Sequence, residues 1–194
     1  ARPGNHHRTL AAEPHLADVF VDGLTGLPNR SLFLDRLEHT FSRAKRRRDM
    51  QFAVLHCGID RFKVVNHSLG HRMGDLLLIS VASLIRDTIR PTDMVARLAG
   101  DEFGILLEDI RDVRSTLHVV SRVLQKLQLP FMLREHEVFS TISFGIVVSE
   151  ADYQGPDAML RDANLAMMGA KQQGGGAYMV FNKGMHDQAV RRME

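Results

Sequence analysis

The stretch Arg97–Phe103, with the sequence RLAGDEF, places two adjacent carboxylates in a glycine-containing turn between two short apolar runs. The runs Met94–Leu98 and Phe103–Leu107 each have the length and composition of a buried strand, so the pattern predicts a β-hairpin. The hairpin would carry Asp101 and Glu102 at an exposed tip. Neighbouring carboxylates of this kind suit a metal ion and a phosphorylated ligand.

Length and composition indicate one globular domain with flanking segments. The chain has 194 residues, of which 44% are hydrophobic, and this is enough for a single well-buried core. The formal net charge is only +2 and Trp is absent, so the chain lacks the charge and the stacking surface typical of proteins that bind nucleic acids. We therefore expect no nucleic-acid partner.

The single cysteine and the short apolar runs predict a cytoplasmic domain. Cys57 lies inside an apolar run, which favours a small buried side chain and excludes a disulfide framework within the chain. No apolar run approaches the roughly 20 residues that a membrane-spanning helix needs. If the parent protein is anchored in a membrane, we expect the anchor to lie outside this chain.

Helical and strand patterns alternate on both sides of the hairpin. Helices are predicted from Asn29 to the basic run 43–48, and over 74–89, 113–127 and 156–171. Strands are predicted over 52–57, over 131–133 paired with 138–144, and over 178–181, with a loop around 61–63. Because hairpins exclude a purely parallel sheet, we expect an α/β (α+β) sandwich with a mostly antiparallel central sheet.

Three segments of different character follow from this pattern. Residues 1–21 mix His, Pro, Gly and charges without periodicity, which is typical of a linker or an expression remnant. Residues 22–183 form the predicted domain. Residues 184–194 have the pattern of a charged helix that leads toward a downstream module.

Several spaced motifs resemble the GGDEF family of diguanylate cyclases, which condense two GTP molecules into the bacterial second messenger cyclic di-GMP. The resemblance covers roughly residues 22–181, and Ala99 stands where the first glycine of the signature is usual. The further motifs are DGLTGLPNR at 22–30, DRFK at 60–63 with Asn66, Gly70-His71, Gly74-Asp75, and DANLAM at 162–167 with Ala170-Lys171 and Gly174. By resemblance the fold is a palm-like nucleotide-cyclase sandwich, with a five-stranded sheet flanked by helices.

The resemblance implies a magnesium site, and the chain departs from it at one position. In the family Mg²⁺ is held by two acidic groups on neighbouring strands; the first corresponds to Asp101, with Glu102 beside it, and the second position carries Gly58. A two-residue shift that used Asp60 instead would move the following motif out of register. We therefore expect the metal ligand to be lost, Mg²⁺ to be present only with GTP, and catalysis to be impaired.

The resemblance also implies contacts to GTP. Asn66 and Asp75 match residues that hydrogen-bond the guanine edge, although a helix cap and a first-turn carboxylate are their structural alternatives. Lys63, counted among the catalytic groups, and Lys171 match phosphate contacts, and Phe62 belongs to the same substrate-binding segment. Gly175 stands where the family commonly has a triphosphate-binding arginine.

A second ligand site is implied by Arg90-Pro91-Thr92-Asp93, which has the RxxD form and spacing of the family's inhibitory site for cyclic di-GMP. Arginine can give a bidentate contact to guanine or phosphate, and aspartate can accept from guanine N–H groups. Arg97 is expected to add charge to the same surface. An exposed salt bridge is the structural alternative.

The sequence leaves several functions open. The first hypothesis is a degenerate GGDEF domain that binds cyclic di-GMP through Arg90 and Asp93, has little or no cyclase activity, and signals to neighbouring sensor and effector domains. The alternatives are an active cyclase, which needs a homodimer because each domain holds one nucleotide, a GTP sensor, and a dimerisation spacer.

Overall fold

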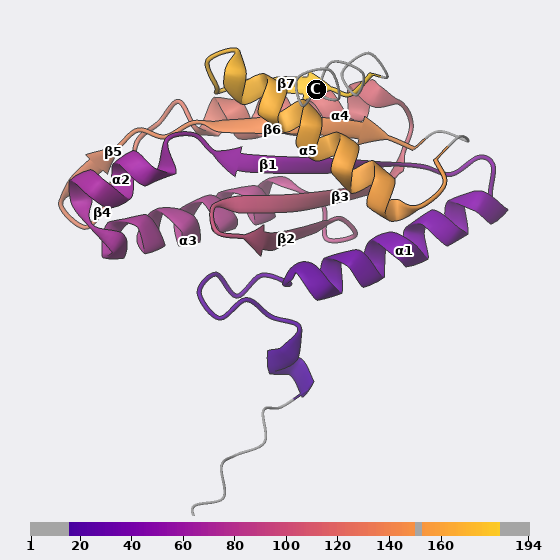
Figure 1. Cartoon of the computed structure of the whole chain (residues 1–194), viewed down its shortest axis with the longest axis horizontal. Helices are drawn as coiled ribbons and strands as arrows, with labels where there is room; N and C mark the ends of the chain where they lie inside the picture. The colour runs from indigo at the N-terminus through magenta and orange to yellow at the C-terminus, as the bar shows by residue number, and fades with distance from the viewer. Residues whose placement is uncertain (1–15, 150–152, 183–194) are drawn as a thin grey trace, which may run out of the picture.

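The computed structural model describes residues 16–149 and 153–182 (Figure 1). Its helices are the 3-10 helix η1 (Leu16–Val19) and the α-helices α1 (Arg30–Arg46), α2 (Phe62–Leu69), α3 (His71–Thr88), α4 (Val113–Lys126) and α5 (Pro156–Gln172). Its strands are β1 (Gln51–Ile59), β2 (Met94–Ala99), β3 (Glu102–Ile110), β4 (Phe131–Leu133), β5 (His136–Val138), β6 (Ile142–Val148) and β7 (Tyr178–Val180).

The described strands build a five-stranded sheet in the order β2-β3-β1-β6-β7, with β4 and β5 as a separate pair. Every pairing in the large sheet is antiparallel except that of β6 with β7. β2 and β3 form the predicted hairpin, which lies at one edge and leaves β1 in the middle. The predicted α/β fold with a mostly antiparallel five-stranded sheet is therefore confirmed.

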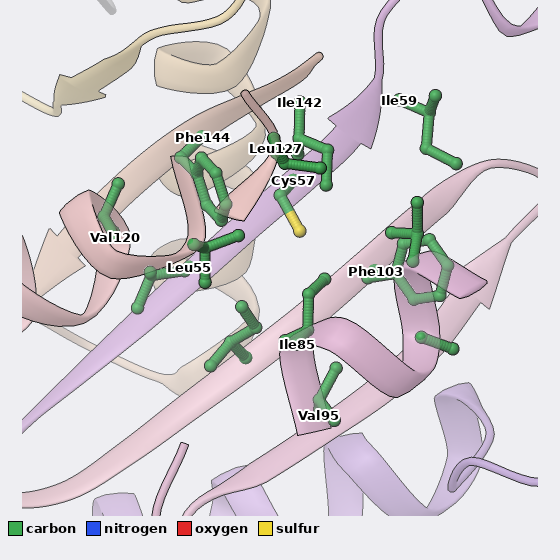
Figure 2. Close-up of a cluster of buried hydrophobic side chains, with 14 of the residues drawn as sticks. Leu55, Cys57, Ile59, Ile85, Val95, Phe103, Val120, Leu127, Ile142 and Phe144 are labelled. Carbon is green, nitrogen blue, oxygen red and sulfur yellow. The ribbon is translucent and has the colours of Figure 1, made fainter. Parts of the chain in front are cut away.

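Different helices cover the two faces of the sheet. Successive side chains of a strand point to opposite faces, so alternate residues of β1 pack against different helices. Leu55, Cys57 and Ile59 of β1 join a core with α3 and α4, part of which is shown in Figure 2. Phe52 and Val54 of β1 pack on the other face with residues of α1 and α5. Burial raises the pKa of the Cys57 thiol, so this side chain is the inert buried group that the sequence predicted.

Helix α1 forms as the sequence predicted. The side chain of Asn29 accepts a hydrogen bond from the backbone N–H of Leu32 at 3.1 Å and so caps the first turn. Phe33 and Leu37 are fully buried on the face toward the sheet. The last turn carries basic side chains, which complement the negative end of the helix dipole.

The prediction of a loop around residues 61–63 is wrong, because helix α2 begins at Phe62. Arg61 takes a left-handed backbone conformation at φ 53° and provides no side-chain cap. Helix α2 therefore lacks a capping side chain as a start signal, although Phe62 and Val65 pack partly buried against the core. Helix α3 likewise begins at His71, three residues before the predicted start, after Gly70 turns the chain at φ 90°.

The predicted strand 138–144 is in fact two strands that belong to different sheets. β5 pairs with β4, whereas β6 starts at Ile142 and pairs with β1. Between them the backbone of Thr141 accepts a hydrogen bond from the N–H of Asp60 at 2.9 Å. Both halves favour β-structure, so the local pattern could not show where the chain changes partner.

Part of the segment expected to be a linker is structured. Residues 16–19 form η1, and Val21 makes an isolated β-bridge with Pro28. The rest of the expected linker, residues 1–15, and the expected helix over 184–194 lie outside the described residues. Within the described residues, no helix combines the length and apolar character needed to cross a membrane.

Candidate functional site

The acidic turn sits against the carboxyl end of β1. Gly58 is the register partner of Glu102, so a side chain at position 58 would lie beside the Glu102 carboxylate on the same face of the sheet. Asp101 belongs to the turn, and its carbonyl oxygen accepts from the N–H of Ile59 at 3.2 Å. Both carboxylates are half-buried, which corrects the expectation of an exposed tip. Glu102, rather than Asp101, is the carboxylate directly opposite Gly58.

Ala99 is compatible with the turn. Only Gly100 has a positive φ, 46°, within residues 97–103. Glycine at position 99 is therefore not required by the backbone of this turn.

Sequence reasoning missed His56, which holds Glu102. The Nε2 atom of His56 lies 2.8 Å from Oε2 of Glu102, and the imidazole is buried while its Nδ1 has no recorded partner. This hydrogen bond is the main cause that lowers the pKa of Glu102. The available signal was the period of two along a strand, which puts His56 on the same face as Gly58.

Lys171, from the last turn of α5, occupies the space beside Gly58. A Cβ atom at position 58 would lie 3.1 Å from Cε and 3.3 Å from Nζ of Lys171. The ammonium donates to the carbonyl oxygen of Ile59 at 3.1 Å and to Oδ1 of Asp60 at 3.4 Å. Burial raises the pKa of Asp101, and the positive charges of Lys171 and Lys63 oppose this rise.

The carboxylate of Asp60 is held by several hydrogen bonds, one of them from the loop 174–176. Its carboxylate accepts from the hydroxyls of Thr141 at 2.6 Å and Ser143 at 2.7 Å, and from the N–H of Gly176 at 2.8 Å. Burial raises the pKa of Asp60, but these hydrogen bonds outweigh it and the pKa is lowered overall. Gly175, at φ 77°, packs so closely that a Cβ atom there would lie 2.7 Å from Oδ2 of Asp60.

These residues do not fit a resident magnesium ion. One carboxylate position is a glycine, Glu102 is bonded to His56, and the backbone oxygen of Ile59 already accepts from Lys171. Within residues 16–149 and 153–182, no group of three or more His, Cys, Asp or Glu side chains could hold a metal ion. Mg²⁺ prefers several hard oxygen ligands in octahedral geometry, and this arrangement offers it an ammonium neighbour instead.

The predicted guanine contacts meet where α2 and α3 come together. The Oδ1 atom of Asn66 is buried without a recorded partner and lies against Gly74, where an added Cβ would be only 1.8 Å away. Phe62 packs against the same glycine. Asp75, which follows Gly74 in the sequence, is exposed. Asn66 lies within α2 and does not cap it, and its buried Oδ1 faces Gly74 at the contact between α2 and α3.

The residues of the RxxD motif contact each other at the open end of the hairpin. Arg90 donates to both carboxylate oxygens of Asp93, at 3.2 and 3.1 Å. Asp93 is 1% exposed and also accepts from the backbone N–H groups of Arg90 and Glu108. Arg90 is 54% exposed, and its ion pair with Asp93 raises its pKa. Asp93 therefore orients Arg90, which offers the accessible charge.

A hollow of about 500 Å³ adjoins Arg90. Its lining includes Arg36, Arg86 and Asp87. Arg36 pairs with the buried Glu108, whereas Arg86 has no hydrogen bond or ion pair recorded with another described residue. The hollow thus presents two accessible guanidinium groups in a setting suited to a phosphate-bearing ligand.

The structure does not bring Arg97 into this hollow. Its guanidinium donates to the carbonyl oxygen of Gly100 at 2.8 Å and to the carboxylate of Asp22 at 3.2 Å. Arg97 instead lines a smaller cavity of about 230 Å³ beside the acidic turn. Its contacts connect the turn to the opening motif at residues 22–30.

Comparisons with known proteins identify the family of this chain. The family model described as "Diguanylate cyclase, GGDEF domain" matches residues 19–177. Two relatives from Pseudomonas aeruginosa are similar: the bifunctional diguanylate cyclase/cyclic di-GMP phosphodiesterase MucR, 39% identical over 89% of this chain and 25% of MucR, and the diguanylate cyclase TpbB, 37% identical over 91% of this chain and 40% of TpbB. The chain thus spans well under half the length of these relatives.

Solved structures show the same relationship. The GGDEF domain of TpbB (YfiN) from Pseudomonas aeruginosa superposes with a TM-score of 0.83, at 35% identity, and the match covers 89% of this chain and 99% of that one. This match and the family model confirm the resemblance found in the sequence. The chain belongs to the GGDEF family of diguanylate cyclase domains.

Proposed function

We propose that this domain binds cyclic di-GMP at the Arg90 surface, has little or no cyclase activity, and passes its ligand state to neighbouring domains of a longer cytoplasmic or membrane-anchored protein. The observation that carries the proposal is the pair formed by Gly58 and Lys171. The position that should supply a metal ligand has no side chain, and an ammonium group lies beside it.

The absence of catalysis follows from the chemistry of the reaction. Attack of a ribose 3′-hydroxyl on the α-phosphate of GTP builds negative charge, which the family neutralises with carboxylate-bound Mg²⁺. A misplacement of about 1 Å at the reacting phosphorus costs on the order of 10²-fold in rate. With Glu102 bonded to His56 and no partner carboxylate at Gly58, we expect such a misplacement.

Binding of cyclic di-GMP is supported by the hollow beside Arg90. A cyclic dinucleotide presents two phosphates and two guanine edges, and a guanidinium group can give either of them two parallel hydrogen bonds. Arg90 is already oriented by Asp93, which reduces the entropy that the ligand contact would cost. Arg86 projects from the same hollow without a recorded partner among the described residues.

Calorimetry with cyclic di-GMP, paired with product analysis from GTP and Mg²⁺, tests both halves of the proposal. We expect saturable binding that Arg90→Ala abolishes and Arg86→Ala weakens, since Arg86 shares the hollow but does not contact Asp93. Arg122→Ala, on an exposed part of α4, serves as the charge-matched control and should bind like the wild type. Unchanged affinity in Arg90→Ala, or robust turnover by the wild type, would overturn the proposal.

Two alternatives retain specific support. Similarity to TpbB, named a diguanylate cyclase, favours a working cyclase that acts as a homodimer, with Asp101, Glu102 and Lys63 as its catalytic groups. The exposure of Lys63 and Asp75 favours a GTP sensor that uses Asn66 and Asp75 for the base, and Lys63 and Lys171 for the phosphates. Product analysis separates the first alternative from the second.

A further inference from the structure

The lost carboxylate leaves behind a cation rather than an empty space. Replacing a carboxylate by hydrogen at position 58 removes one negative charge from the end of β1, and the Nζ atom of Lys171 lies 3.3 Å from the point where a Cβ atom would begin the missing side chain. Its two recorded partners are oxygen atoms, the carbonyl of Ile59 and a carboxylate oxygen of Asp60. A divalent cation held at this end of β1 would need oxygen donors of the same kind.

The surroundings suit a polyanion. Lys171 is 31% exposed and lines a groove of about 900 Å³ together with Arg61 and the glycine loop 174–176. Helix α2 begins directly after Arg61 with no side-chain cap, so its positive dipole end favours a phosphate, while the N–H groups of Val64 and Val65 donate to the carbonyl oxygen of Arg61. Lys63 in its first turn is exposed.

We propose that this end of the domain binds the phosphate groups of a guanine nucleotide without a divalent metal ion, with the ammonium of Lys171 in place of the metal. The inference rests on the GTP-sensor alternative and is independent of the Arg90 surface. The fixed ammonium supplies one positive charge, and it is tethered to α5 by its own side chain.

The proposal predicts the direction in which Mg²⁺ changes the affinity of the domain for GTP. In a site that uses carboxylate-bound Mg²⁺, magnesium strengthens nucleotide binding because it bridges protein and phosphate oxygens. Here Mg²⁺ bound to GTP reduces the negative charge that Lys171 attracts, and it is repelled by the ammonium at close range. Magnesium should therefore leave the affinity unchanged or reduce it.

Calorimetric titration with GTP, in excess EDTA and again in millimolar Mg²⁺, measures whether Mg²⁺ raises or lowers the affinity. For the wild type we expect binding in EDTA at least as tight as in Mg²⁺. Lys171→Met should weaken binding in EDTA by tenfold or more, whereas Lys45→Met, which removes the same charge from α1 beside Phe41, should not change it. Thermal melts of each variant show whether it is folded.

The variant Gly58→Asp restores a carboxylate at the position where the wild type has none. Its Cβ would meet the flexible end of Lys171 and Met167 Sδ at 3.1 to 3.3 Å, so modest side-chain movement accommodates it. We expect this variant to gain a dependence on Mg²⁺, with GTP affinity at least tenfold higher in Mg²⁺ than in EDTA.

Three results would overturn the inference: no binding of GTP in EDTA, a tenfold or greater strengthening by Mg²⁺ in the wild type, or unchanged affinity in Lys171→Met. A parallel titration with cyclic di-GMP distinguishes its failure from failure of the proposed function. If Arg90→Ala loses cyclic di-GMP binding while any of the three GTP results above is observed, the proposed function is supported and the metal-independent site is rejected.

Discussion

The two ends of the β2–β3 hairpin hold their charged groups in different ways. At the open end, the buried Glu108 accepts from Arg36, Thr40 and Arg43, and its backbone contacts both residues of the RxxD motif. At the turn, Glu102 has His56 as its recorded side-chain partner and faces a glycine. A carboxylate surrounded by donors stabilises the fold, whereas the partly exposed charged groups at the turn have fewer fixed partners and are better placed to contact a ligand.

The open end should show the larger effect on stability. The partners of Glu108 lower its pKa from 4.5 to about 2 despite burial. We expect Glu108→Gln to reduce the free energy of unfolding at pH 7 by about 2 kcal/mol, less than the full shift implies, because Arg36 and Arg43 are half-exposed and solvent screens them. Urea denaturation measures the change, with Asp35→Asn on the exposed side of α1 as the control.

The difference in the free energy of unfolding between the wild type and Glu108→Gln should shrink as the pH falls. The pKa of Glu108 is lower in the folded state than in the unfolded state, so its stabilising contribution is present above about pH 4.5 and is lost as the pH falls toward 2. The wild type and Glu108→Gln should therefore converge in stability across that window. A gap that stays constant down to pH 2.5 would show that the charge of Glu108 is not its cause.

At the turn end, Gly175→Arg tests whether the second departure from the family pattern can be reversed. The backbone at φ 77° disfavours any side chain, and the new Cβ would crowd the Asp60 carboxylate. We expect a loss of about 1–2 kcal/mol in urea denaturation and no gain in GTP affinity. Gly23→Ala, with no atom within 4 Å and no positive φ, is the control for adding a side chain to a glycine. A tighter GTP complex would show that the loop 174–176 adapts.

The smallest effect is expected for Ala99→Gly, which restores the usual first glycine of the signature. Because the backbone of Ala99 has no positive φ, glycine gains nothing there and only adds freedom to the unfolded chain. The free energy of unfolding should fall by less than about 1 kcal/mol, with no appearance of cyclic di-GMP from GTP and Mg²⁺. Restored turnover would place the defect at the signature instead of at Gly58.

Much of the fold was readable from local patterns. The hairpin, the Asn29 cap of α1 and the alternation of helices and strands each depend on residues within a few positions of one another. Helix α2 was missed because its start, Arg61, lacks a cap, and the break between β5 and β6 was missed because pairing partners lie far away in the sequence. The motifs of the site were found, but their contacts were not.

The sequence by itself determined the family, the sheet and the absence of a carboxylate at position 58, because a missing side chain is visible without coordinates. The tertiary structure alone decided what takes its place: 112 residues separate Lys171 from the Ile59 carbonyl to which it donates. His56 likewise acquires its role only when β1 and β3 pair. Periodicity and capping act over a few residues, whereas the electrostatic balance of a site is set by groups that packing brings together.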